Sequence, residues 1–182
     1  MTRIRRLFLL LALAAAGACG DDNDLDDANI PNGVDTVTLG ALVGTPITTP
    51  SGFSIDVGAV RTDRTTDFEF AYNIQTDGQP VFLPRTAIGL PSTTAAPGLQ
   101  LRNETFGEIV LAGSNGYVTD EPVPIEAGQR YVVRSRVVCS GLAVPKYGKL
   151  EVLSFEDRSV TFQVLTNNNC GYKGLEPGLP DQ

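Results

Sequence analysis

From residue 34 onward, apolar and polar side chains alternate along the chain with a period of two. The alternation is clearest over residues 67–74, where the apolar members are Phe68, Phe70, Tyr72 and Ile74. A period of two places apolar side chains on one face of a strand, so each such segment predicts a half-buried β-strand. The 19 glycines and 12 prolines favour many turns, and no amphipathic helix of useful length interrupts the pattern. We therefore predict an all-β fold.

Other parts of the chain carry weaker strand and turn signals. Further strands are predicted at residues 53–59, 81–83, 131–138, 149–155 and 160–165. The residues Glu156-Asp157-Arg158-Ser159 predict a tight hairpin between the last two strands, whereas residues 84–98, rich in Pro, Thr and Ala, predict a long loop. The pair Thr105 and Glu108 matches a capping box, which predicts a short helix, although β-branched residues directly after it favour a strand equally.

The segment 125–133 resembles the turn before a late strand in immunoglobulin-like and fibronectin-type sandwiches. In those domains an apolar residue, a glycine and a tyrosine form a tyrosine corner; here these are Ile125, Gly128 and Tyr131. The resemblance implies a single antiparallel, Greek-key-like β-sandwich of seven to nine strands. We expect this domain to cover residues 35–175, followed by a disordered tail over residues 176–182.

The first 18 residues have the three parts of a secretory signal peptide. Three arginines within residues 2–6 precede an apolar run over residues 7–18 that ends in small residues. This run is well short of the ~20 residues that a permanent transmembrane helix needs. The sequence Ala16-Gly17-Ala18-Cys19 resembles the lipobox of bacterial lipoproteins, which implies that Cys19 is lipidated after cleavage. The alternative is an ordinary cleaved signal with a cysteine there by chance.

Two export routes remain open for this segment. The residues Arg5-Arg6-Leu7-Phe8-Leu9 resemble the core of the twin-arginine signal, although Ile4 stands where Ser or Thr is usual. The two arginines also suit the charged region of a general secretory signal, which is the interpretation that we favour.

Residues 19–34 predict an acidic, flexible tether, because a charged stretch with almost no apolar residues cannot offset the entropy of ordering. Asp22, Asp24 and Asp26 have the spacing of the first ligands in an EF-hand, but Asp27 and Gly33 occupy positions that need Gly and Glu. In lipoproteins of double-membrane bacteria an Asp directly after the cysteine favours retention in the inner membrane. Because Gly20 stands there, the resemblance favours the outer membrane, with the domain facing the periplasm or the exterior.

The other two cysteines predict a disulfide. With Cys19 assigned to lipid, Cys139 and Cys170 remain, and an even number of cysteines in an exported protein typically forms disulfides. If the last three strands form a meander, both cysteines lie at the same edge of the sheet. Free or metal-binding thiols are the alternative, but they are supported by no CxxC pattern and by no histidine.

Composition excludes several classes of function. The net charge of −7 argues against a nucleic-acid surface, which needs a basic footprint. The absence of histidine removes the most common general base and metal ligand. The motifs of serine hydrolases, P-loop proteins and dinucleotide-binding proteins are also missing from the sequence. We expect no cofactor and no nucleic-acid partner.

Three groups of residues are candidate sites. Asp67 and Glu69 could be the paired carboxylates of a glycosidase, but a solvated outer strand face explains them better. Arg134, Arg136 and Lys149, with Glu151 among them, could form a basic patch for an acidic sugar or a lipid head group, or simply pair across strands. The loop 140–148, with Pro145 and Tyr147, could serve in recognition or be a plain connection.

These observations together predict a lipid-anchored protein of the bacterial cell envelope. Its sandwich domain is expected to bind a partner or to serve a structural role, without enzymatic activity. Partners would be the membrane, through the N-terminal anchor, and an envelope protein or a glycan. The alternatives are a surface-displayed carbohydrate- or ligand-binding module and a hydrolase that uses carboxylates alone.

Overall fold

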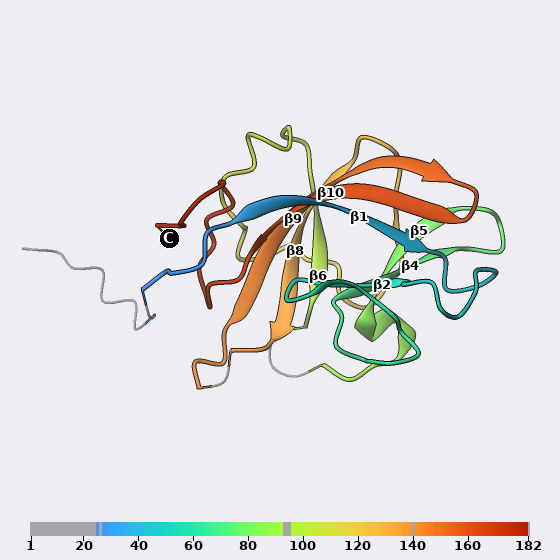
Figure 1. Cartoon of the computed structure of the whole chain (residues 1–182), viewed down its shortest axis with the longest axis horizontal. Coiled ribbons are helices and arrows are strands. Elements are labelled where there is room, and N and C mark those ends of the chain that lie inside the picture. Colours follow the sequence, from blue (N-terminus) through green and yellow to red (C-terminus); the bar gives the residue numbers. More distant parts are fainter. Residues whose placement is uncertain (1–24, 26, 93–95, 140, 182) are drawn as a thin grey trace, which may run out of the picture.

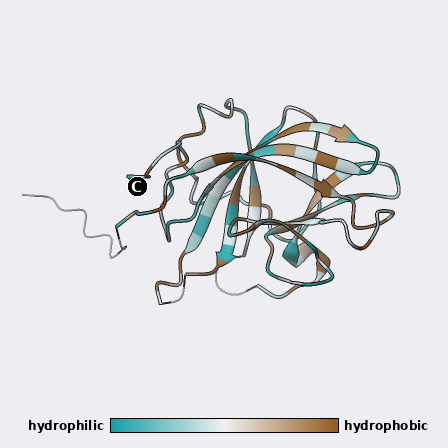
Figure 2. Ribbon diagram, in the orientation of Figure 1, coloured by the Kyte–Doolittle hydropathy of each residue, from teal (hydrophilic) through white to brown (hydrophobic). Residues whose placement is uncertain are grey.

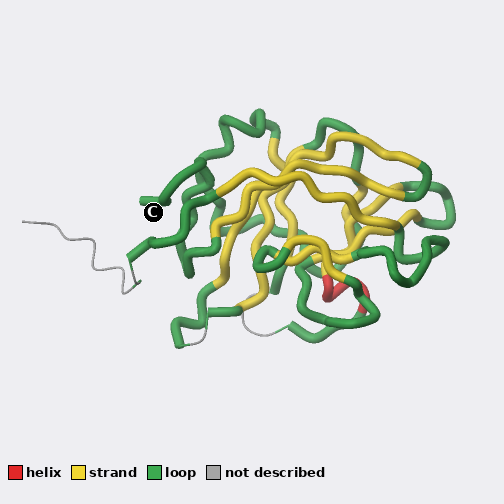
Figure 3. Tube along the Cα trace, viewed as in Figure 1, coloured by secondary structure: helices red, strands yellow, loops and turns green. Residues whose placement is uncertain are grey.

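The computed structural model describes residues 25, 27–92, 96–139 and 141–181, which form two packed antiparallel β-sheets (Figure 1). Each sheet has five strands, and the described residues contain no α-helix and one short 3₁₀ helix, η1 (Arg85–Ile88). The tube in Figure 3 shows how strands and loops make up nearly all of the described chain. The expected all-β sandwich is therefore confirmed, with ten strands in the described residues rather than the expected seven to nine.

The first sheet has the strand order β1-β10-β9-β8-β6. Its strands are β1 (Gly33–Gly40), β6 (Gly98–Arg102), β8 (Arg130–Val137), β9 (Pro145–Glu156) and β10 (Ser159–Asn167). The last three strands form the predicted meander, and the β9–β10 hairpin turns at Asp157 and Arg158, between the paired residues Glu156 and Ser159. Strand β1 returns to pair with β10 over its whole length, which makes the N-terminal strand one edge of the sheet.

The second sheet has the order β3-β2-β4-β5-β7. Its strands are β2 (Gly52–Ser54), β3 (Gly58–Val60), β4 (Phe70–Ile74), β5 (Pro80–Pro84) and β7 (Val123–Pro124). The chain enters this sheet after β1 and leaves it for β6, so that the two sheets are joined by several crossing connections. Strands β4 and β5 correspond to two of the predicted strands.

An aromatic cluster fills the space between the sheets. Phe82 of β5 lies at its centre, with its ring centroid 4.5 Å from that of Phe70, 5.8 Å from that of Phe162 and 6.2 Å from that of Tyr131. All four side chains are almost completely buried. Along the strands, hydrophobic and hydrophilic residues alternate as the period of two requires (Figure 2). Burial of this aromatic surface supplies a large part of the driving force for stacking the sheets.

A second, smaller apolar cluster covers the opposite face of the first sheet. Its sheet residues are Val132, Tyr147 and Leu165, and its covering residues come from the long loops, among them Ile109 and Leu175. Val132 and Leu165 both pair with Lys149, which shows that they share one face of the sheet, while the residues next to them in sequence face the aromatic cluster. The sandwich thus carries a layer of loop and C-terminal chain on its outside.

The hydroxyl of Tyr131 donates a hydrogen bond to the carbonyl of Pro124, seven positions earlier (3.0 Å). This contact ties the start of β8 to the end of β7. Burial raises the pKa of this tyrosine to about 12.

Some predicted segments differ in the structure. Residues 53–59 are two strands rather than one, because Gly58 takes a positive φ of 79° and the chain turns back so that Phe53 pairs with Ala59. Thr105 and Glu108 do form a hydrogen-bonded turn, with the carboxylate of Glu108 accepting from Thr105 N–H (2.9 Å), but no helix or strand continues from it.

The ends of the domain also extend beyond the expected limits. We expected a tether up to residue 34, whereas β1 starts at Gly33 and Asn32 is already buried. We expected a disordered tail from residue 176, yet Gly178 forms a β-bridge with Asn32, with N–H to O=C distances of 2.7 and 3.1 Å. The two ends of the described chain therefore lie together at one end of the molecule (Figure 1).

Candidate functional site

Glu69 is buried between the sheets, directly before β4, with only 1% of its surface exposed. The expectation that Asp67 and Glu69 share a solvated face is therefore wrong for Glu69, although the side chain of Asp67 is 72% exposed. One carboxylate oxygen of Glu69 accepts a hydrogen bond from the Ile55 N–H (2.8 Å), and the other accepts from Nη1 of Arg136 (2.7 Å). The first bond fixes the turn between β2 and β3, and the second reaches across to the other sheet.

Arg136 faces Glu69 because β8 contains a β-bulge. Arg134 pairs with Tyr147 and Val137 pairs with Pro145, so two residues, Ser135 and Arg136, lie opposite Lys146 alone. An extra residue reverses the faces of the residues beyond it. Arg136 is thereby turned towards the second sheet, whereas Arg134, two positions earlier, stays on the outer face. The Ser135 hydroxyl accepts the Lys146 N–H (2.8 Å) and satisfies the backbone at the bulge.

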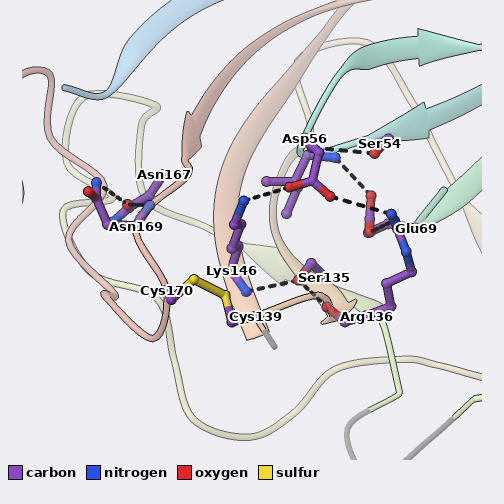
Figure 4. Close-up of polar contacts among 11 residues, drawn as sticks. Ser54, Asp56, Glu69, Ser135, Arg136, Cys139, Lys146, Asn167, Asn169 and Cys170 are labelled. Carbon is purple, nitrogen blue, oxygen red and sulfur yellow. Dashed lines mark hydrogen bonds and ion pairs between the residues drawn. A yellow bond between two sulfur atoms is a disulfide. The ribbon is translucent and has the colours of Figure 1, made fainter. Parts of the chain in front are cut away.

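Asp56 completes a chain of alternating charges (Figure 4). One of its carboxylate oxygens accepts from Lys146 Nζ at 2.7 Å, and the other lies 3.4 Å from Nη2 of Arg136. Along the order Glu69, Arg136, Asp56, Lys146, the residues thus come alternately from the second sheet and from the first. We call these four residues the charged cluster.

The charged cluster is suited to holding the sheets together. Burial raises the pKa of Glu69, against the opposing effects of the nearby Arg136 charge and of the hydrogen bond from Ile55. General acid or base catalysis needs a carboxylate oxygen that can reach a substrate proton. Both oxygens of Glu69 and both of Asp56 already accept bonds from protein groups.

Cys139 and Cys170 form a disulfide, as the sequence predicted, with their Cα atoms 5.9 Å apart. Cys139 follows β8 and Cys170 follows β10, so the bond joins two loops at the same end of the first sheet (Figure 4). The end of β8 that carries Arg136 is therefore covalently tied to the segment that follows β10.

Asn169, next to Cys170, holds the segment that leads into β1. Its side-chain oxygen accepts the N–H groups of Asn29 and Ile30 (3.0 Å each), and its side-chain nitrogen donates to the Ile30 carbonyl (2.7 Å). Asn167 supports it, because the Asn167 side-chain oxygen accepts from both the backbone and the side chain of Asn169 (2.9 Å each). We call this set of bonds the asparagine clasp.

The predicted basic patch does not exist as one surface. Arg134 donates to the Ala96 carbonyl (2.7 Å) and lies over the ring of Tyr117, while the β-bulge directs Arg136 into the charged cluster. Lys149 is only 2% exposed and donates to the Ile109 carbonyl (2.9 Å). Glu151, expected among them, instead pairs with Arg130 at 2.9 Å.

The predicted recognition loop is shorter than expected. Strand β9 begins at Pro145, which pairs with Val137, and Tyr147 is buried in the outer apolar cluster. Of the described residues 141–148 of the expected segment, therefore, only 141–144 form a loop.

Sequence reasoning missed the charged cluster and the asparagine clasp. Asp56 and Lys146 are separated by 90 positions, and Ile30 and Asn169 by 139. Pairs so distant in one sequence leave no local signal. The sequence shows only that Glu69 and Arg136 each lie at a polar position of a segment with a period of two. That pattern predicts the outer, solvated face of a strand for both residues, whereas both belong to the charged cluster.

Cys19 lies outside the described residues, so its predicted lipidation stays a prediction. In the part of the chain that the structure covers, no helix has the length and apolar character to cross a membrane, and no three acidic or cysteine side chains converge as metal ligands would. Comparison of the chain with protein-family models, with curated proteins and with solved structures found no match.

Proposed function

We propose that this chain is a lipoprotein of the bacterial cell envelope, anchored through Cys19, whose sandwich domain binds or braces another envelope component without catalysis. The observation that carries the proposal is the division of the three cysteines. Cys139 and Cys170 are joined to each other, which leaves Cys19 as the remaining thiol, directly after the small residues Ala16-Gly17-Ala18 that end the apolar run. A disulfide also suits an oxidising compartment outside the cytoplasm.

Lipidation is a sufficient anchor in physical terms. Each buried CH₂ group of an acyl chain contributes about 0.8 kcal/mol to membrane binding, so two or more chains on one residue anchor a protein stably. The described domain then needs no membrane-crossing segment of its own. Gly20 favours the outer membrane by resemblance to lipoproteins of double-membrane bacteria.

A binding or bracing role is favoured over a hydrolase by the carboxylates of the charged cluster. Each oxygen of Glu69 and Asp56 accepts a bond from within the protein. A hydrolase that works with carboxylates alone needs one such group to protonate a leaving group and another to attack or to activate water.

The anchor is tested with Cys19→Ser in cells fed labelled palmitate. Wild-type protein is expected to incorporate the label and to float with membranes in a density gradient, whereas Cys19→Ser loses the label. The matched control is the double variant Cys139→Ser/Cys170→Ser, which should keep the label although it lacks two thiols. Label on Cys19→Ser at the wild-type level would refute the anchor. Gly20→Asp tests the sorting separately, since it should move the protein to the inner-membrane fraction.

A further inference from the structure

A pocket of about 300 Å³ lies beside the charged cluster. It is lined by Asp67, Arg85, Pro91, Ser92, Arg136 and Val137. The volume is at the small end of the range for ligand sites in proteins and suits one monosaccharide-sized molecule. Of its two arginines, Arg136 already faces the carboxylates of Asp56, Asp67 and Glu69.

Arg85 differs from Arg136, because its side chain has no hydrogen-bond acceptor among the described residues. It is the first residue of η1, and its backbone N–H donates to the Glu69 carbonyl (3.1 Å), which fixes its main chain against the second sheet. Its surface is only 9% exposed, and its Nε is fully enclosed without a hydrogen-bond partner. The guanidinium donates no hydrogen bond and forms no ion pair with any described residue.

An enclosed hydrogen-bond donor without an acceptor, such as Nε of Arg85, is costly for a protein. Arginine stays protonated at every physiological pH, so it cannot escape the cost of desolvation by losing its charge. A donor left unsatisfied in this way lowers the stability of the folded state. Groups that weaken the fold in this way are characteristic of functional sites, where the ligand supplies the missing partner.

The chemistry of the pocket indicates which partner is missing. The planar fork of a guanidinium matches the two oxygens of a carboxylate. Asp67, at the rim and largely exposed, adds acceptor oxygens for hydroxyl groups. A carboxylate for Arg85 and hydroxyls for Asp67 occur together in an acidic sugar.

We propose that this pocket binds the uronate unit of an acidic sugar, with Arg85 receiving the carboxylate and Asp67 the adjacent hydroxyls. This deepens the proposed binding role of the sandwich and rests on it, but it is independent of the lipid anchor. The site differs from the basic patch expected from the sequence, since Arg85 was not among its residues.

The proposal is tested by titrating the purified full chain, extracted in detergent, with sodium galacturonate and following the heat of binding and the thermal unfolding midpoint. Galacturonate should bind and raise the midpoint, whereas galactose, which lacks only the carboxylate, should do neither. Equal responses to both sugars, or no response to galacturonate, would overturn the assignment. Acetate binding as tightly as galacturonate would overturn the role of the hydroxyls. Glycine binding more tightly than galacturonate would overturn it in favour of an amino acid.

Variants of Arg85 separate a ligand contact from a structural role. Arg85→Met should abolish the response to galacturonate while the midpoint without ligand stays equal or rises, because an enclosed donor without an acceptor is removed. Arg85→Lys keeps the charge but loses the fork, and should bind roughly tenfold more weakly, equivalent to about 1.4 kcal/mol. Arg64→Met, at an exposed position, is the matched control and should bind like the wild type. Wild-type affinity in Arg85→Met would refute the proposal; should that variant fail to fold, wild-type affinity in Arg85→Lys would refute it.

The anchor and the pocket can fail separately. Loss of palmitate labelling in Cys19→Ser leaves the galacturonate titration unchanged, and a failed titration leaves the labelling result unchanged.

Discussion

Nη1 of Arg136 and Oε1 of Glu69 lie 2.7 Å apart and join the two sheets, although the residues are 67 positions apart in sequence. The Glu69 side chain has no exposed surface, whereas that of Arg136 is 17% exposed. In this ion pair, Glu69 is therefore shielded from solvent, whereas Arg136 is partly accessible to it. This asymmetry decides how stability should respond to pH and to substitution at the charged cluster.

Glu69→Gln is expected to gain stability relative to the wild type as pH rises. Burial raises the pKa of Glu69 in the folded protein above its unfolded value. Above the unfolded pKa, the unfolded wild type loses a proton that the folded protein still holds, so wild-type stability falls as pH rises through the folded pKa. Glutamine has no proton to lose and avoids this fall.

Urea unfolding of both proteins between about pH 4 and about pH 8 measures the effect of Glu69. Asp67→Asn, at the exposed neighbour, is the control and should follow the wild type more closely. If the stability of the wild type instead rises relative to that of Glu69→Gln as pH rises, the charge of Arg136 outweighs burial and lowers the pKa of Glu69.

Removal of the disulfide should destabilise the domain substantially. The bond closes a loop of 31 residues, for which the chain-entropy model gives roughly 3.5–4 kcal/mol. Cys139→Ser/Cys170→Ser should therefore unfold at a lower urea concentration than the oxidised wild type, and wild type treated with reductant should approach the double variant. Unchanged unfolding of the wild type after verified reduction would contradict this expectation.

Phe82→Ala should be among the most damaging apolar substitutions in the core. Phe82 contacts Phe70, Tyr72, Tyr131 and Phe162, which come from both sheets. Truncating a fully buried phenylalanine costs about 3–5 kcal/mol through lost transfer energy and the cavity that remains. Calorimetric or urea unfolding measures the loss. The control is Phe155→Ala at the exposed C-terminal end of β9, where a loss as large as that of Phe82→Ala would show that the aromatic cluster is not the centre of the core.

Asn169→Ala should release the segment before β1 without unfolding the sandwich. The substitution leaves the N–H groups of Asn29 and Ile30 without their acceptor, and loss of such side-chain hydrogen bonds costs about 1–3 kcal/mol. Faster hydrogen exchange of these two amides, with unchanged exchange in β9 and β10, is the expected result. Asn168→Ala is the neighbouring control. Uniformly faster exchange throughout both sheets would show that the clasp supports the whole fold.

Much of the fold was predictable from the sequence because it rests on local periodicity. The meander of β8, β9 and β10 was found from alternation and from the Glu156–Ser159 turn, and the position of the disulfide followed from that meander. The segment 53–59 was mispredicted because its alternation continues through Gly58, where a positive φ reverses the chain. Periodicity alone does not distinguish one long strand from a tight hairpin with the same spacing.

The charged cluster was hidden for a different reason. Arg134 and Arg136 have the spacing of one strand face, and only the extra residue at the β-bulge separates them. Whether β8 bulges depends on how it pairs with β9, which no pattern within β8 records. The burial of Arg85 could not be predicted either, because an arginine in a Pro- and Thr-rich segment is expected to be exposed to solvent.

The position of the asparagine clasp also determines where mechanical load enters the domain. Tension applied to the chain on the N-terminal side of β1 passes through Asn29 and Ile30 before it reaches that strand, and these residues are held by Asn169. One peptide bond further on, Cys170 is covalently joined to Cys139 at the end of β8. Part of a pull on the N-terminus is therefore passed to an interior strand of the first sheet, instead of falling entirely on β1, the edge strand that would otherwise peel away first.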